Sequence, residues 1–274
     1  MKLNLGIMQG RLVEREIKSR LQSFPKKNWI KEIKLARKLK IKFIEWTLDY
    51  KDFYQNPLIK NPTKLKSILS NNNISVKTVT CDFFMQKPFF KIPNNKNKIF
   101  EYLKILINSC VKLGIKYVVI PLVDKSSIKS KKEEKLVITE LIKFEKKNYF
   151  GKTKILFETD YDPKHVINFI SKFNNKFGIN YDAGNSAGLN YNINQEFEYF
   201  DKVFNVHIKD KIIHGKTVRL GKGNLNLNNL ISNLKKKYKG NLILQTYIPK
   251  NKKKVLYETL KNFNYLKQAI VNAN

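Results

Sequence analysis

The sequence predicts an α/β fold, a (β/α)8 TIM barrel that forms one domain over residues 1–274. Strand-like and helix-like stretches alternate from one end of the chain to the other, and eight such pairs follow one another. The length of 274 residues matches a single α/β barrel, which usually has about 250. Because no linker rich in proline or serine and no shift in composition divides the pairs, we expect one domain.

Each expected strand is a short apolar or β-branched run, and each expected helix has apolar residues at a helical spacing. The strands are expected at residues 3–8, 42–46, 74–81, 117–123, 155–157, 178–181, 203–208 and 241–245. The helices that follow them are expected at residues 29–39, 62–69, 100–113, 131–147, 163–173, 194–199, 227–237 and 254–271. Pro62 suits a first helical turn, and Gly114 suits the C-cap of the third helix.

The composition indicates a large hydrophobic core in a cytoplasmic protein. Hydrophobic residues make up 42% of the chain and aromatic residues 12%, which argues against a disordered chain. No run approaches the ~18 apolar residues of a membrane span, and residues 1–10 become polar too soon for a signal peptide. Cys81 and Cys110 match no metal or redox motif, so we expect two reduced cysteines and a cytoplasmic location.

The net charge of +32 does not by itself indicate a nucleic-acid-binding protein. Only five of the 54 basic residues are arginine, so 49 are lysine, and the lysines are scattered along the whole chain. Basic residues that bind nucleic acid are expected to cluster. Lys, Asn and Ile are also what AT-rich codons encode, so genome composition explains much of the excess. We expect no nucleic acid and no membrane partner, although an anionic small molecule would be attracted.

Four polar residues end four successive apolar runs in the second half of the chain: Glu158, Asp182, His207 and Gln245. Their spacings of 24, 25 and 38 residues each fit one βα unit, which takes about 25 to 40 residues. Closed into a barrel, parallel strands bring these ends to one rim, where two carboxylates, an imidazole and an amide oxygen suit one divalent cation. Singly, each residue has an ordinary structural explanation; their joint order and spacing favours a metal site.

Six short strings carry a resemblance to a known family. Four are Phe-Glu-Thr at 157–159, Tyr-Asp-Ala-Gly-Asn at 181–185, Val-His-Ile-Lys-Asp at 206–210 and Leu-Gly-Lys-Gly at 220–223. Two more, Gly-Ile-Met-Gln-Gly-Arg-Leu at 6–12 and Ile-Glu-Trp at 44–46, fit the first two strands. In this order and spacing, the strings resemble the sugar phosphate isomerase/epimerase family of the xylose isomerase-like TIM barrel superfamily, over the full length of the chain.

The resemblance implies one divalent metal ion bound at the ends of strands five to eight. In the family the ligands are Glu, Asp, His and Glu, and the first three correspond to Glu158, Asp182 and His207. The fourth corresponds to Gln245, a departure, because an amide offers an oxygen to a metal but neither takes nor gives a proton. With one carboxylate fewer, a lower metal affinity is expected. Mn²⁺, Mg²⁺ or Co²⁺ suit this ligand set best, and Zn²⁺ is compatible with it.

The expected chemistry is proton transfer beside a carbonyl group of a small sugar or sugar phosphate. A metal ion chelated by the carbonyl oxygen and the neighbouring hydroxyl stabilises a cis-enediolate when the carbon-bound proton leaves. Glu158 is the expected base, and Gln245 takes the position of the second catalytic residue of the family's two-base epimerases. Because Gln245 cannot return a proton, one-base isomerisation or loss of water also fits; Lys209, Asp82 and Asp210 are the nearest candidates for a second base.

Further polar residues are expected to line the same rim and bind the substrate. They are Gln9, Arg11, Glu45, Asp82, Asn185, Lys209, Asp210 and Lys222. The long loop of residues 9–27 is expected to lie over the barrel mouth, where Arg11, Arg15, Arg20 and Gln22 offer anion-binding groups, or to form a dimer contact. Lys222 lies in a Gly-Lys-Gly string, for which a phosphate-binding loop and an ordinary loop are the two interpretations. His165 and His214 are expected to be structural or exposed to solvent.

The sequence leaves several functions to weigh. The first is an isomerase or epimerase of carbohydrate metabolism, and the second is an inosose-type dehydratase on the same metal site. The nuclease branch of the superfamily needs several histidines for three zinc ions, whereas this chain has three histidines in all and only His207 at a matching strand end. A non-catalytic sugar-binding descendant is also compatible with Gln245. Relatives are frequently dimers or tetramers, so a homo-oligomer is compatible with the resemblance.

Overall fold

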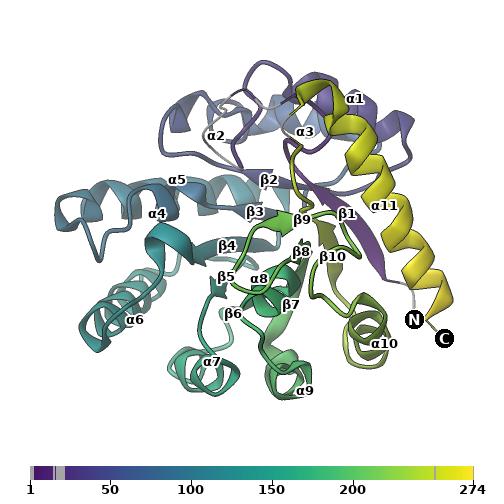
Figure 1. Cartoon of the computed structure of the whole chain (residues 1–274). Helices are drawn as coiled ribbons and strands as arrows, with labels where there is room; N and C mark the ends of the chain where they lie inside the picture. The colour runs from purple at the N-terminus through teal and green to yellow at the C-terminus, as the bar shows by residue number, and fades with distance from the viewer. Residues whose placement is uncertain (1–2, 15, 17–21, 250, 274) are drawn as a thin grey trace.

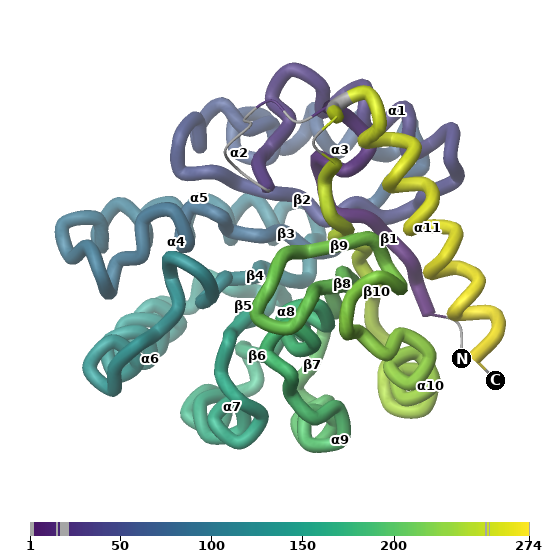
Figure 2. The backbone as a smooth tube through the Cα atoms, in the orientation of Figure 1, coloured from purple at the N-terminus to yellow at the C-terminus, as the bar shows by residue number. Residues whose placement is uncertain are grey.

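Eight parallel strands close into a barrel in the computed structural model, which describes residues 3–14, 16, 22–249 and 251–273 (Figure 1). Around the barrel the strands follow the order β1, β10, β7, β6, β5, β4, β3, β2. The chain therefore runs round the barrel once, as the colour gradient of the backbone tube shows (Figure 2). The predicted (β/α)8 TIM barrel is confirmed.

The barrel strands lie close to the predicted positions. They are β1 (Asn4–Met8), β2 (Ile44–Thr47), β3 (Thr78–Thr80), β4 (Tyr117–Leu122), β5 (Lys154–Thr159), β6 (Phe177–Asp182), β7 (Val203–Ile208) and β10 (Asn241–Leu244). A small antiparallel hairpin of β8 (Asp210–Lys211) and β9 (Thr217–Val218) follows β7 outside the barrel sheet. Strand β3 is shorter than the predicted run of residues 74–81, because Ser75 makes only an isolated bridge with Phe43.

Helices surround the barrel. The longer ones are α1 (Trp29–Lys38), α3 (Pro62–Asn71), α5 (Lys96–Leu113), α6 (Lys131–Glu145), α7 (Pro163–Ile170), α10 (Leu227–Lys237) and α11 (Val255–Asn272). The shorter ones are α2 (Pro57–Lys60), α4 (Asp82–Gln86), α8 (Ala183–Gly188) and α9 (Ile193–Glu196), and a 3₁₀ turn at Phe197–Lys202 continues α9. Among the described residues, no helix is long and apolar enough to cross a membrane.

Polar side chains begin many of these helices by accepting a hydrogen bond from a backbone amide of the first turn. This capping satisfies amides that have no partner within the helix. The capping residues are Asn56, Asn61, Ser130, Asp162, Asp182, Asn192 and Asn226. The asparagine-rich composition therefore has a structural use, and the cap at Asp182 fixes a strand-end carboxylate to the start of α8.

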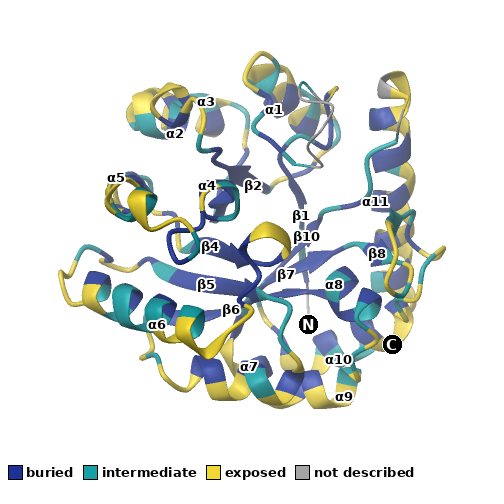
Figure 3. Cartoon of the chain, turned by 60° about the vertical axis from the view of Figure 1, so that its left-hand side comes forward, coloured by how far each residue is buried: buried dark blue, intermediate teal, exposed yellow. Residues whose placement is uncertain are grey.

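The strands are buried on both faces, and the outward faces of the helices are exposed (Figure 3). Between strands and helices the packing is apolar, with fully buried side chains such as Ile7, Phe157 and Phe169. The inside of the barrel is different, because it holds a polar network. Nδ2 of Asn205 donates to Oε2 of Glu45 and to Oδ1 of Asn180, at 2.7 Å in each case. This network joins β2, β6 and β7 beneath the carboxyl ends of the strands.

Candidate metal centre

Glu158, Asp182 and His207 meet at the carboxyl ends of three adjacent strands. Asp182 is in register with His207 across β6 and β7, and Glu158 lies one residue beyond the pair formed by Phe157 and Ile179. One ligand atom from each of the three residues lies within 4.8 Å of the others, and all three residues are buried. Nδ1 of His207 is 3.4 Å from Oε2 of Glu158 and 3.8 Å from Oδ2 of Asp182. Three of the four residues of the predicted strand-end constellation therefore form one cluster.

The imidazole of His207 is held from behind by a carboxylate. Its Nε2 lies 2.7 Å from Oε1 of Glu45, and both side chains are fully buried. Glu45 is itself fixed, since Oγ1 of Thr80 donates to Oε1 and Nδ2 of Asn205 donates to Oε2. A carboxylate behind a histidine fixes the tautomer and ring orientation of a metal ligand. With Nε2 occupied by Glu45, Nδ1 is the atom of His207 that faces the cluster.

Hydrogen-bond donors orient the two carboxylates. Nδ2 of Asn185 donates to Oε1 of Glu158 at 3.0 Å, and Nδ2 of Asn180 donates to Oε2 at 3.2 Å. The backbone amide of Asn185 donates to Oδ1 of Asp182 at 2.8 Å, which is the cap of α8. Nζ of Lys209 lies 2.7 Å from Oδ2 of Asp182. Gly184 permits this approach, because a Cβ at that position would collide with the side chain of Lys209.

The two carboxylates differ in their affinity for a proton. Burial raises the pKa of Glu158, and the charge on Asp182 raises it further. Burial also acts to raise the pKa of Asp182, but the charge on Lys209 is the largest opposing cause, and that pKa lies below its ordinary value. Glu158 is therefore the better proton acceptor of the pair, whereas Asp182 stays ionised.

Gln245 follows β10 on the side of the barrel interior. Its backbone amide donates to the carbonyl of Ile208, and Ile243, two residues earlier, is in register with His207. Residues two apart on a strand share a face, so Gln245 points to the same side as His207, farther toward the rim. Its Nε2 donates to Oε1 of Gln22 at 3.0 Å. Its Oε1 is buried and accepts no hydrogen bond from any residue that the structure describes.

The donor set fits a divalent cation. The buried cluster offers two carboxylates and an imidazole, and an unsatisfied amide oxygen lies on the next strand. Oδ2 of Asp182 accepts no hydrogen bond in the described part of the chain either, although it forms the ion pair with Lys209. Buried acceptors without donors cost free energy unless a positive group neutralises them. Oxygen ligands with one imidazole nitrogen are a common set for divalent metals.

No protein-family model matches the sequence, and no curated protein matches it. Solved structures match the fold over nearly the whole chain. One is the IOLI protein with a binding zinc atom, with 17% identity, 99% of each chain covered and a TM-score of 0.74. Another is a xylose isomerase-like TIM barrel protein from Mycobacterium smegmatis in complex with magnesium, with 14% identity, 97% of each chain covered and a TM-score of 0.68.

A third is a D-psicose 3-epimerase from Clostridium cellulolyticum H10 with D-tagatose, with 12% identity, 98% of this chain and 99% of the other covered, and a TM-score of 0.70. The chain has the xylose isomerase-like TIM barrel fold. At these identities the likeness concerns the fold alone, and it agrees with the (β/α)8 barrel predicted from the sequence.

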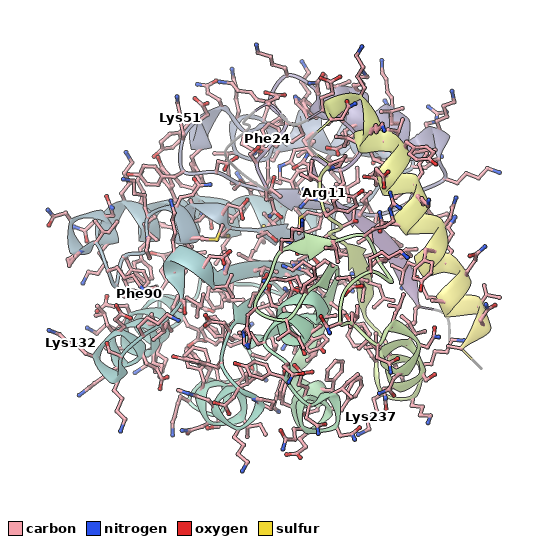
Figure 4. The ribbon with its side chains drawn as sticks, in the orientation of Figure 1. Arg11, Phe24, Lys51, Phe90, Lys132 and Lys237 are labelled. Atoms are coloured by element: carbon pink, nitrogen blue, oxygen red, sulfur yellow. The ribbon has the colours of Figure 1, made fainter. Side chains whose placement is uncertain are left out.

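Several predicted substrate-binding residues of this xylose isomerase-like barrel are engaged with the protein itself. Oε1 of Gln9 accepts from the backbone amide of Thr47 at 3.0 Å, and Glu45 holds His207 from behind. Nε of Arg11 donates to the carbonyls of Gln245 and Thr246, at 3.1 Å each. Arg11 lies near the middle of the view in Figure 4, whereas Lys132 and Lys237 lie at the edge of the molecule.

Asp210 and Lys222 lie apart from the cluster. The carboxylate of Asp210 accepts from the backbone amides of Gly221, Gly223 and Leu225, so it closes the loop after β9. Lys222 is exposed on that loop. Among the described contacts, neither side chain bonds to Glu158, Asp182 or His207. The substrate-binding roles predicted for these residues remain predictions, and the geometry gives Asp210 a structural one.

The loop of residues 9–27 reaches across the rim through one side chain. Nε2 of Gln22 lies 3.2 Å from both carboxylate oxygens of Asp82, at the end of β3, and Oε1 of Gln22 accepts from Gln245 after β10. Strands β1 and β2 lie between these two points in the barrel order. Gln22 thus spans part of the mouth, as predicted for this loop. Arg15 and Arg20, predicted as anion-binding groups, lie outside the described residues.

The polar layer beneath the cluster was not predicted from the sequence. Asn180 and Asn205 lie inside β6 and β7, and their amides contact Glu158 and Glu45. Asn180 is flanked by Ile and Tyr, and Asn205 by Phe and Val. An asparagine between large apolar or aromatic residues is unusual in a strand, so this pattern could have identified Asn180 and Asn205 as functional residues.

The remaining two histidines lie elsewhere. Nε2 of His165 is 2.6 Å from Oε2 of Glu134, and the ring stacks on Tyr161 at 3.8 Å between centroids. His214 lies in the turn between β8 and β9, and its backbone amide donates to the carbonyl of Gly188. His165 is therefore a structural histidine with a carboxylate partner, outside the cluster.

Proposed function

We propose that the protein is a divalent-metal-dependent isomerase or epimerase of a small sugar or sugar phosphate, with Glu158 as the base. The observation that carries this proposal is the buried group of Glu158, Asp182 and His207, with ligand atoms within 4.8 Å of one another at the barrel rim. The fold supports the same class of reaction, since one protein of similar structure is a D-psicose 3-epimerase with D-tagatose.

Glu158, Asp182 and His207 would hold the metal ion, with Oε1 of Gln245 as a fourth ligand. The donor set favours Mn²⁺, Mg²⁺ or Co²⁺ and is compatible with Zn²⁺; similar structures contain zinc and magnesium. When bound, such an ion stabilises the negative charge that develops on substrate oxygens as a carbon-bound proton is removed.

Glu158 is suited to remove that proton. Its pKa is raised by burial and by the charge on Asp182, which strengthens it as a base relative to an exposed glutamate. Asn185 and Asn180 each donate to one of its oxygens, so the carboxylate has a fixed orientation. A fixed base costs less entropy in the transition state than a mobile one.

Lys209 is suited to orient the substrate. Burial acts to lower the pKa of Lys209, but the charges on Asp182 and Glu158 outweigh it and raise that pKa above its ordinary value. The ammonium group therefore keeps its proton and can donate to a substrate hydroxyl or phosphate oxygen, but it cannot remove a proton. Burial and the neighbouring Asp49 raise the pKa of Asp82 well above its ordinary value, which makes Asp82 the better candidate for a second proton-transfer group.

Gln245 supports two other assignments. Because an amide cannot exchange a proton, reactions with a single basic face need no change in this site: aldose–ketose isomerisation, which is one form of the proposed activity, and an inosose-type dehydration, which is the first alternative. A non-catalytic sugar-binding protein would also tolerate the amide. The isomerase or epimerase assignment is preferred over sugar binding because the residues that would act as base and metal ligands lie together with the residues that orient them.

Deuterium exchange tests the proposal. The protein is loaded with Mn²⁺ and incubated in D₂O with a panel of ketoses, aldoses and their phosphates, and deuterium at carbon is measured by mass spectrometry. We expect deuterium in one substrate and its product, loss of the exchange in Glu158→Gln, and retention in His165→Ala, a histidine that is also paired with a glutamate.

The outcomes separate the alternatives. Loss of water from the substrate would identify a dehydratase on the same site. Binding of a sugar without exchange or turnover, in protein that holds Mn²⁺, would contradict the enzyme assignment and favour a sugar-binding protein.

A further inference from the structure

Three side chains form a directional chain of hydrogen bonds across the rim. Nε2 of Gln22 lies 3.2 Å from Oδ1 and from Oδ2 of Asp82. Oε1 of Gln22 accepts from Nε2 of Gln245 at 3.0 Å. Gln22 comes from the loop after β1, Asp82 from the start of α4 and Gln245 from the end of β10. The chain therefore joins three separate parts of the barrel mouth.

The direction of this chain follows from the chemistry of its first member. Nε2 of Gln22 lies at the same distance, 3.2 Å, from both carboxyl oxygens of Asp82, so at least one of these oxygens accepts from the amide nitrogen whether or not the carboxyl group carries a proton. With its nitrogen bonded to Asp82, Gln22 presents its oxygen to Gln245. That oxygen attracts the nitrogen of the Gln245 amide. The oxygen of Gln245 then points the other way, where it is buried and accepts no hydrogen bond within the described residues.

This orientation matters because a primary amide is asymmetric as a metal ligand. Its oxygen has lone pairs that bind a cation, whereas its nitrogen carries two hydrogens and has no lone pair to offer. A glutamate at the same position would present an oxygen in either orientation. Only with glutamine does the metal site require that another residue fix which end of the group faces the barrel interior.

We propose that Gln22 is a positioning residue for the metal centre: it holds the Gln245 amide with the carbonyl oxygen facing the barrel interior, where Glu158, Asp182 and His207 lie. This inference rests on the proposed function. Among the described contacts, Gln22 bonds to none of Glu158, Asp182 and His207, so it acts on the metal site only through Gln245. It also gives a reason for the hydrogen bond between the side chains of Gln22 and Gln245.

A double-mutant cycle tests the inference. Gln22→Met removes both polar atoms and keeps the length of the side chain. In the natural Gln245 background, Gln22→Met is expected to weaken Mn²⁺ binding roughly 3- to 10-fold, the effect of losing one orienting hydrogen bond. In the Gln245→Glu background the same change is expected to alter the Mn²⁺ dissociation constant less than about twofold, because a carboxylate needs no such orientation.

Isothermal titration calorimetry with Mn²⁺ on metal-free protein supplies the four dissociation constants. The matched control is Gln86→Met, since the amide of Gln86 also bridges two groups near the rim, Oδ1 of Asp49 and the backbone amide of Tyr50, without contacting Gln245. Thermal unfolding of each metal-free variant shows whether the fold is retained.

Equal weakening in both backgrounds would mean that Gln22 only supports the loop, and would overturn the inference. No weakening in the Gln245 background would overturn it as well. The metal site itself is tested separately by Glu158→Ala: if wild-type protein binds no Mn²⁺, or Glu158→Ala binds it as tightly, the proposed function fails and the inference with it. If Glu158→Ala abolishes binding but Gln22→Met does not weaken it, the inference alone fails.

Discussion

Nε2 of His207, on β7, lies 2.7 Å from Oε1 of Glu45, on β2, and both side chains are completely buried inside the barrel, where β10 and β1 separate their two strands. The contact joins residues that are 162 positions apart in the sequence. Glu45 accepts a hydrogen bond from the ring and leaves Nδ1 turned to Glu158 and Asp182. Such a carboxylate raises the basicity of the ligating nitrogen and fixes its direction.

Replacing Glu45 is therefore expected to weaken metal binding although Glu45 is not a ligand. Glu45→Gln keeps the size of the side chain but removes the charge that stabilises the Nε2–H form of the ring. We expect the Mn²⁺ affinity to fall about 10- to 100-fold, with the fold retained. Calorimetric titration measures the affinity, and Glu134→Gln, beside His165, is the matched control. An unchanged affinity in Glu45→Gln would show that Glu45 does not tune the site.

Gln245→Glu is expected to strengthen metal binding and to weaken the metal-free fold. An added carboxylate raises the ligand charge, so Mn²⁺ should bind roughly tenfold more tightly. Without metal, the new carboxylate is added to a buried rim that already holds the carboxyl groups of Glu158 and Asp182, so the melting temperature should fall, and excess Mn²⁺ should restore it. Calorimetry and thermal unfolding measure both effects.

If epimerisation arises only in the Gln245→Glu variant, the natural protein is not a two-base epimerase. If Gln245→Glu binds Mn²⁺ more weakly than wild type, Gln245 is not a metal ligand.

Asp210 is expected to act on stability rather than on metal binding. Its carboxylate accepts from three backbone amides of the loop after β9. Because Asp210→Ala leaves these amides without an acceptor, we expect a loss of about 2–4 kcal/mol in the free energy of unfolding. Urea unfolding measures this loss. A stable Asp210→Ala protein with impaired substrate binding would instead support the substrate-binding role predicted from the sequence.

Glu32 should make stability depend on pH. On α1, its Oε1 accepts from the amides of Gly10 and Leu12, and burial raises its pKa from 4.5 to about 7. Because the folded-state pKa lies above the unfolded-state value, protonated Glu32 stabilises the fold below pH 4.5, and this contribution is lost as the pH rises through about 7. The difference corresponds to roughly 3 kcal/mol.

Glu32→Gln removes this titration while keeping an acceptor for the two amides. Its stability relative to wild type should therefore increase by about 3 kcal/mol between pH 4.5 and pH 8. Urea unfolding at several pH values, with a chelator to exclude metal effects, measures this difference. A difference that is constant across the pH range would show that Glu32 titrates normally in the folded protein.

The barrel was predictable because its signals are local and repeated. Eight alternating strand and helix patterns indicate a parallel α/β barrel, and closure of the barrel places the strand ends together. Glu158, Asp182 and His207 could therefore be assigned to one cluster from spacing alone. The short helices α4 and α8 were missed, since five or six residues carry too little periodicity to be distinguished from a loop.

The parts of the site that were not predicted depend on contacts between distant segments. The position of Glu45 at a strand end suggested substrate binding, but its partner is a histidine far along the chain, which only the closed barrel brings into contact. Asp210 likewise lies two residues after the end of β7, yet its carboxylate accepts from backbone amides of the loop after β9. Gln22 was predicted only as one of four anion-binding groups in a loop, because nothing local indicates that it bonds to Asp82 and Gln245.

The most direct test of the account is the metal content of the protein. Wild-type protein purified without chelators, or loaded with Mn²⁺ and desalted, is analysed by plasma mass spectrometry beside Glu158→Ala, His207→Ala and the control His165→Ala. We expect about one equivalent of divalent metal per chain in wild type and in His165→Ala, and none in the other two variants. Wild-type protein that holds no metal after Mn²⁺ is added, or Glu158→Ala and His207→Ala proteins that hold as much as wild type, would contradict the metal centre.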